Sequence, residues 1–193
     1  MKGKDGMPSD VSNEPLASVT GEEPFEVVFT RYYPLVYRLA YRCTGQSEEA
    51  DDIAQEVFLR FYRTPPRAGG EGERRAWLCR VATNLGLNAL RARQRRVFHE
   101  EKAGSVSAGE EEAQLDPEQQ AIAREQAALV RAILAELPER QQTYIILRSA
   151  GLSYAEIAQV TGVAAASVGS LLARAEREFR RRYHERARAT KAE

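Results

Sequence analysis

Apolar side chains recur every three or four residues in several separate stretches of this chain, which is the spacing of one face of an α-helix. Gly45 ends the first stretch, the pair Pro65-Pro66 ends the second, and a third runs from about Glu73 to Val97. The residues expected to form the core of these three helices are Phe25, Phe29, Tyr32, Val36, Leu39, Cys43, Ile53, Val57, Phe58, Phe61, Leu78, Val81, Ala82, Leu85 and Ala89.

The second half of the chain repeats this pattern after an interruption. Gly, Ser and Glu dominate the segment from Val97 to Leu115, which has no apolar stripe. Helical spacing resumes after Asp116 and continues to about Tyr183. No alternating strand pattern occurs, so we expect an all-α fold of two small helical domains joined by a flexible acidic linker. The expected segments are a disordered tail (1–22), a domain (23–97), the linker (98–116), a second domain (117–184) and a tail (185–193).

Composition narrows the class of protein. With 193 residues, 43% hydrophobic and 29% charged, the chain suits one or two small globular domains. Apolar runs are too short for a transmembrane helix, and the polar N-terminus lacks the apolar region of a secretory signal. Cys43 and Cys79 lie within helical patterns and outside any CxxC motif, so neither a disulfide nor a metal site is expected, nor any other cofactor. A cytoplasmic protein is predicted.

Charge is strongly segregated along the chain. The formal net charge is zero, from 28 basic and 28 acidic residues. Residues 74–96 contain seven arginines and no acid, whereas residues 100–118 contain seven acids and one lysine. This segregation indicates that separate regions of the chain bind their own partners, which the net charge of zero does not reveal.

The third predicted helix has an unusual polar face. Residues at steps of three and four on this face are Trp77, Arg80, Asn84, Asn88, Arg91 and Arg95, with Arg93 and Arg96 close by. An aromatic ring, two carboxamides and several guanidinium groups can stack an unpaired base, bond its edges and neutralise phosphates. We therefore expect this face to bind melted DNA. The alternatives are that Trp77 packs in the core and that Asn84 is an ordinary polar residue of a helix.

The second predicted helix carries the opposite sign. Asp51, Asp52, Gln55 and Glu56 are expected on or near one exposed side, with Phe58 and Leu59 close by. An acidic patch edged by apolar groups suits a basic protein surface, and the alternative is a solvated helix face.

Near the C-terminus, residues 154–173 fit a helix-turn-helix, with Gly162 at the turn. Val168 and Leu171 are expected to face inward. The outward residues expected to contact DNA are Ser167, Ser170, Arg174 and Arg177. They promise modest base readout, because no long side chain lies deep in the second helix. The alternatives are a plain helical hairpin and, for the arginine run that continues to Arg181, a solvated face.

Four segments taken in order resemble a known family. They are DDIAQEVF at 51–58, WLCRVATNL at 77–85 with the arginines that follow, LPER at 137–140 and GLSYAEIA at 151–158. This set resembles bacterial RNA polymerase sigma factors of the extracytoplasmic-function (ECF) group of the sigma-70 family. The resemblance covers about residues 23–97 and 117–184.

The resemblance implies a role for each surface. The acidic patch would dock on the coiled coil of the polymerase beta-prime subunit. The loop 64–75 and Asn84 would capture a flipped base of the minus-ten element, and the arginines after Asn84 would hold the upstream duplex and the melted strand. The helix-turn-helix would read the minus-thirty-five element while gripping the beta flap. Relatives commonly carry lysine and arginine where this chain has Gly169 and Leu171.

The resemblance also implies the protein's partners. They would be core polymerase, promoter DNA and, in many such factors, an anti-sigma protein, with no membrane. The factor itself would catalyse no reaction.

Three other readings compete with this one. A transcriptional regulator with one C-terminal DNA-binding domain would bind DNA unaided and leave the acidic patch inert. An enzyme is disfavoured, because the chain shows no carboxylate pair, phosphate loop or nucleophile triad. A structural adaptor of helical hairpins is disfavoured by the arginine helix.

Overall fold

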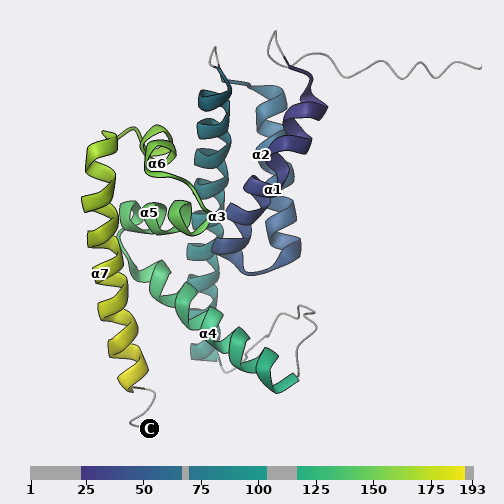
Figure 1. Ribbon diagram of the computed structural model, residues 1–193. Coiled ribbons are helices and arrows are strands. Elements are labelled where there is room, and N and C mark those ends of the chain that lie inside the picture. The colour runs from purple at the N-terminus through teal and green to yellow at the C-terminus, as the bar shows by residue number, and fades with distance from the viewer. Residues whose placement is uncertain (1–22, 67–69, 104–116, 190–193) are drawn as a thin grey trace, which may run out of the picture.

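The computed structural model describes residues 23–66, 70–103 and 117–189, and these ranges contain helices and no β-strand (Figure 1). The helices are α1 (Phe25–Thr44), α2 (Ser47–Arg63), α3 (Glu71–Ala103), α4 (Pro117–Glu136), α5 (Glu139–Ser149), α6 (Tyr154–Thr161) and α7 (Ala165–Ala189). The all-α prediction is confirmed.

Helices α1, α2 and α3 pack as a three-helix unit. The left-handed conformation of Gly45 (φ 67°) ends α1, as predicted. Gly86 lies where α3 crosses α1, and a Cβ there would lie 2.8 Å from the Cys43 sulfur. Glycine is therefore needed for the close approach of these two helices.

Helices α4 to α7 form the second unit. Ser153 and Glu156 make the capping box that opens α6, in which the Ser153 amide donates to Glu156 at 2.7 Å. Gly162 adopts φ 73° and ends α6, and α7 then leaves at 93° to it. This is the geometry of a helix-turn-helix, as the sequence predicted.

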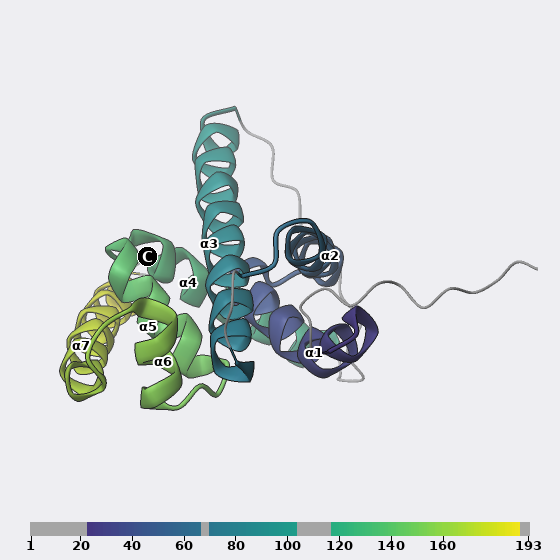
Figure 2. The same cartoon turned by 90° about the horizontal axis from the view of Figure 1, so that it is seen from above.

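The long helix α3 belongs to the first unit and lies at its boundary with the second (Figure 2). Helices α1 and α2 cover one side of it, and α4, α5 and α6 pack along the other. The buried apolar side chains of both units form one continuous cluster. The second unit thus packs on the side of α3 that α1 and α2 leave uncovered.

Three details differ from the predictions. Helix α3 extends to Ala103 and α7 to Ala189, because good helix formers follow Val97 and Tyr183 without an intervening glycine or proline. The predicted linker therefore begins with helix, and its remaining part, with Asp116, lies outside the described residues. Leu172 (3% exposed) is the fully buried leucine of α7, while Leu171 is only half-buried.

Within the described ranges no single helix is long and apolar enough to cross a membrane. The pair α6 and α7 passes that test of length and composition only when both helices are counted together across their 93° bend.

Candidate nucleic-acid and protein-binding surfaces

The predicted polar face of α3 is real, and it points toward the second unit. Arg80, Asn84 and Asn88 are exposed and Arg91 is half-buried on the flank that faces α5 and α6. Arg93 is half-buried, and Arg95 and Arg96 are exposed further along the helix. This polar face, which we call the α3 stripe, therefore lies at the surface of α3 and at the boundary between the two halves.

Trp77 takes an intermediate position. It is half-buried, and its ring lies 5.8 Å from the ring of Phe61 in α2. Packing against the core thus accounts for part of this side chain, and only its remaining exposed edge is free for a ligand.

Most arginines of α3 have partners on other elements of the protein. Arg80 donates to the carbonyl oxygens of Val160 (2.8 Å) and Gln159 (3.2 Å) at the C-terminal end of α6. Arg91 pairs with Glu139 at 3.3 Å. The Arg80 contacts arise because the last carbonyls of a helix carry partial negative charge and attract a guanidinium group, whereas Arg91 forms an ordinary ion pair with a carboxylate.

Arg74, Arg75 and Arg93 are also engaged. Arg74 is buried and bonds Glu23 at 3.1 Å, Arg75 pairs with Glu156 of α6, and Arg93 donates to the Thr44 carbonyl at the end of α1. Among the described residues, Arg95 and Arg96 are the α3 arginines with no such contact.

A polar cleft of about 270 Å³ lies at the middle of this boundary. Asn84 and Arg80 line it from α3, and Glu139, Arg140 and Thr143 line it from α5. The carboxamide predicted to contact a base therefore opens into a space between the two halves.

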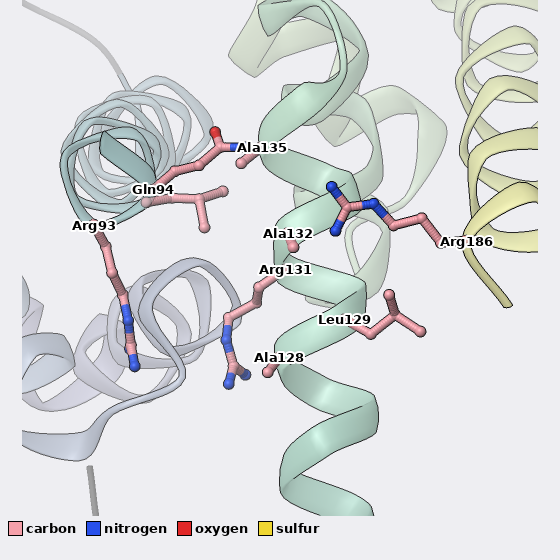
Figure 3. A pocket seen from close by; sticks show the side chains of 9 residues that line it. Arg93, Gln94, Ala128, Leu129, Arg131, Ala132, Ala135 and Arg186 are labelled. Carbon is pink, nitrogen blue, oxygen red and sulfur yellow. The ribbon is translucent and has the colours of Figure 1, made fainter. Parts of the chain in front are cut away.

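A second hollow of about 350 Å³ lies further along α3 (Figure 3). Leu90, Arg93 and Gln94 of α3 face a row of small side chains on α4, and Arg186 reaches in from α7. The two halves are consequently in contact without filling the space between them.

The residues of α2 that were predicted to dock on a protein partner differ in exposure and in their contacts. Asp52 and Gln55 are exposed, whereas Glu56 pairs with Arg60 at 2.6 Å. Asp51 accepts a hydrogen bond from Tyr33, which raises the pKa of that tyrosine to about 12.

Phe58 does not belong to this surface. It is 2% exposed, and its ring packs against Phe29 and Phe25 of α1, so it belongs to the core between α1 and α2. Leu59, expected beside the acidic groups, is 41% exposed, and Tyr62, at 46% exposed, extends the surface further. Tyr62 follows Gln55 and Leu59 at helical spacing, a signal that could have found it from the sequence.

The outward face of the helix-turn-helix is present as predicted. Ser167, Ser170, Arg174 and Arg177 are all exposed on α7. Arg174 and Arg177 have no ion pair or hydrogen bond with any described residue. By contrast, Arg180 and Arg181 pair with glutamates of α7 itself, Arg180 with Glu176 at 3.2 Å. The alternative of a solvated helix face therefore fits Arg180 and Arg181.

The cysteines are buried and unpaired, and burial raises the pKa of Cys43 to about 12 and that of Cys79 to about 11. No group of three His, Cys, Asp or Glu side chains in the described ranges is arranged to hold a metal ion.

Comparison with known proteins identifies the family. Residues 28–96 match the model of Sigma-70 region 2, and residues 127–179 match that of Sigma-70 region 4. The first match covers α1, α2 and most of α3, and the second covers the helix-turn-helix. The chain belongs to the ECF group of the sigma-70 family, the class of transcription initiation factors that direct RNA polymerase to promoters.

Several curated relatives carry that description. The chain is 31% identical to the RNA polymerase sigma-H factor of Pseudomonas aeruginosa over 157 residues, 78% of this chain and 81% of that one. It is 31% identical to the ECF RNA polymerase sigma-E factor of Haemophilus influenzae over 160 residues, 80% and 84% of the two chains. It is 34% identical to SigE of Mycolicibacterium smegmatis over 148 residues, and that match spans 56% of the relative's length.

Solved structures share the fold. The sigma factor RpoE of Bartonella quintana, solved with the anti-sigma factor NepR, superposes with a TM-score of 0.51 at 21% identity. This match covers 82% of this chain and 95% of that one. CnrH, solved with the cytosolic domain of CnrY, gives 0.50 at 20% identity and covers 80% and 84%.

Proposed function

We propose that this initiation factor works through three separate surfaces. The α2 surface docks on core polymerase, the α3 stripe holds melted promoter DNA, and the α7 face reads the minus-thirty-five element. The observation that carries this proposal is the placement of opposite charges on two helices of the first unit, α2 and α3. Acidic and apolar groups stand on α2, and a carboxamide-arginine face stands on α3.

The α3 stripe has the groups that strand-separated DNA requires. Asn84 and Asn88 offer donors and acceptors to a base edge, and Arg91, Arg93, Arg95 and Arg96 offer charge to the phosphates. Arg80 and the exposed edge of Trp77 border the base-binding region. Binding of a flipped base would favour the melted state, and this requires no bond to be made or broken by the protein. The proposed factor is thus not an enzyme.

The α2 surface provides the sharpest test of docking. Charge reversal in Asp52→Lys places a cation among Gln55, Leu59 and Glu56, where a basic partner surface would be repelled. We expect this variant to lose co-purification with core polymerase while its thermal unfolding is unchanged. Glu125→Lys, the same charge change on an exposed part of α4, serves as the matched control and should co-purify normally. Normal co-purification of Asp52→Lys would contradict the docking role.

The α7 face provides the test of duplex binding. Arg174 and Arg177 are available for phosphates, so each alanine substitution should lower the salt-dependence slope of minus-thirty-five DNA binding by about 1. Arg180→Ala, which removes an arginine already paired with Glu176, is the control and should change the slope less. Equal slopes for all three variants would contradict the assignment.

Further partners follow from the relatives. We propose that the second unit also contacts the beta flap and that an anti-sigma protein binds the chain, as NepR and CnrY bind the two structural neighbours. The factor would then act in the cytoplasm with the polymerase. We also propose 23–97 and 117–184 as its two functional domains. A regulator that acts without polymerase remains the second candidate, and it predicts that Asp52→Lys leaves transcription unchanged.

A further inference from the structure

We propose that the hollow bordered by α3, α4 and α7 is a binding site for a small anionic amphiphile, a ligand with an apolar chain and a carboxylate or phosphate head group. The hollow has a volume of about 350 Å³, and its described lining residues differ from those of the cleft beside Asn84 (Figure 3). Arg93 is the lining residue that also belongs to the α3 stripe. The site is thus distinct from the three surfaces of the proposed function and goes beyond them.

The walls of the hollow are mostly apolar. Leu90 of α3 and Leu129 of α4 line it, together with the small side chains of Ala128, Ala132 and Ala135. Pockets for small molecules have volumes of about 300–1,000 Å³ and mostly apolar walls. Because apolar surface gains free energy when it is removed from water, a hydrocarbon chain suits this hollow better than a polar group.

Three arginines border the hollow, and none of its described lining residues is an acid. They are Arg93 of α3, Arg131 of α4 and Arg186 of α7, so their charges converge from three helices (Figure 3). A guanidinium group is always charged, and its fork of N–H donors binds a carboxylate or a phosphate through two parallel hydrogen bonds. A negatively charged head group is therefore the polar end that this rim selects.

Arg93 and Arg131 meet at the C-terminal end of α1. Arg93 donates to the Thr44 carbonyl at 3.2 Å, and a Cβ on Gly45 would overlap the guanidinium group of Arg131. The C-terminal end of a helix carries about half a negative charge, whereas two guanidinium groups carry two positive charges. This side of the hollow therefore has a surplus of positive charge, which an anionic head group would neutralise.

The third arginine of the rim shares its acidic partner. Glu136 of α4 pairs with Arg186 and also with Arg182 at 3.5 Å. One carboxylate thus serves two guanidinium groups, so the positive charge of the rim extends to the α7 side of the hollow.

The phosphate of a nucleic acid is the alternative ligand for these arginines. A phosphodiester has no apolar chain, so it would leave the walls around Leu90 and Leu129 in contact with water. An amphiphile matches both parts of the site, because its chain covers the leucines and its head group meets the arginines. The combination of apolar walls and a cationic rim therefore favours the amphiphile.

Binding of alkyl anions to the full-length isolated chain tests the site. Hexyl, octyl and decyl phosphate, and fatty acids of the same chain lengths, are titrated calorimetrically below their micelle-forming concentrations. Affinity should rise about 4-fold for each methylene that is buried, and decyltrimethylammonium, which has a cationic head group, should bind at least about 10-fold more weakly. Tighter binding of the phosphates or of the carboxylates identifies the head group, and both results support the site. Binding of inorganic phosphate as tight as that of decyl phosphate would indicate a phosphate site of the kind a nucleic acid uses and would overturn the proposal.

Two variants place the ligand in the hollow. Ala132→Phe fills the space and should lower the affinity for decyl phosphate about 10-fold or more, whereas Ala123→Phe, on an exposed part of α4, should leave it unchanged. Arg131→Gln removes one charge of the rim and should lower the affinity about 10-fold, with Arg124→Gln, also exposed on α4, as its matched control. Thermal unfolding shows that each variant is folded. Unchanged affinity in folded Ala132→Phe and Arg131→Gln would show that the ligand binds elsewhere and would overturn the proposal.

Discussion

The two long arginine-rich helices of this protein use their charges in different ways. In α7 most of the paired arginines bond glutamates of the same helix, as Arg181 does with Glu178 at 2.6 Å and Glu185 at 2.7 Å, while Arg182 and Arg186 reach Glu136 of α4. In α3 no acid lies between residues 74 and 96, so its arginines reach other elements, as Arg80 does to α6 and Arg93 to α1.

The difference shows how charge pattern along a helix predicts the range of its contacts. Glutamates three or four residues away neutralise an arginine locally and leave the helix solvated. Without them, the same residue type must find a carbonyl, a carboxylate or a phosphate elsewhere. Arg80 and Arg93 of α3 are therefore held by partners on other helices, whereas Arg180 and Arg181 are paired within α7.

Each of the two helices also has a glycine in its interior, Gly86 in α3 and Gly169 in α7. Substitution of these glycines should give the largest difference in the free energy of unfolding. Gly86→Ala places a methyl group 2.8 Å from the Cys43 sulfur, and this overpacking should lower the free energy of unfolding by about 1–3 kcal/mol. Gly169→Ala in α7 meets only the Tyr154 ring at 3.5 Å, an ordinary contact, and should stabilise by about 1 kcal/mol. Urea denaturation of both variants measures the difference, and the same sign for both would contradict the packing described here.

Removal of one arginine from each helix should give a smaller contrast. Arg91→Ala leaves the buried Gln142 oxygen without its partner and should lower the free energy of unfolding by about 1–2 kcal/mol. Arg181→Ala removes pairs that are exposed to solvent, so its effect on the same urea transition should be close to zero. A larger loss for Arg181→Ala than for Arg91→Ala would invert the comparison.

The smallest effect concerns the pH dependence of α7. Hydrogen bonds from Arg181 and Arg182 lower the pKa of Glu178 to about 2. Because the folded pKa lies below the unfolded value, the contribution of this group to stability is complete above about pH 4.3 and is lost as the pH falls toward 2. Carboxyl NMR titration should show Glu178 ionised at pH 3, and Arg181→Ala with Arg182→Ala should return its pKa to the ordinary range. An ordinary pKa in the unmodified chain would show that these pairs do not persist in solution.

Much of this fold could be predicted from local signals. Gly45, Gly162 and the Ser153–Glu156 box mark helix ends through backbone conformation and capping, which neighbouring residues determine. The apolar spacing of α1 and α2 likewise identified Val36, Val57 and Phe61 as core.

The features that could not be predicted depend on contacts between residues that are distant in the sequence. Phe58 was expected beside the acidic surface because Asp51 and Glu56 flank it, yet its ring points into the aromatic cluster of α1. The partners of Arg80 and Arg91 lie more than forty residues away, at α6 and α5, and no spacing rule indicates which helix end will face them. The outward residues of α7 needed only helical periodicity, and were found.

We propose that the α3 face contacts melted promoter DNA, and position 84 tests this proposal most directly. A photo-reactive amino acid placed there, in the cleft between the halves, reports the neighbours of this face in the isolated chain and in the open promoter complex. In the isolated chain it should crosslink to α5 or α6, and in the open promoter complex to the minus-ten region of DNA. Crosslinks that stay within the protein in an open complex would contradict the account.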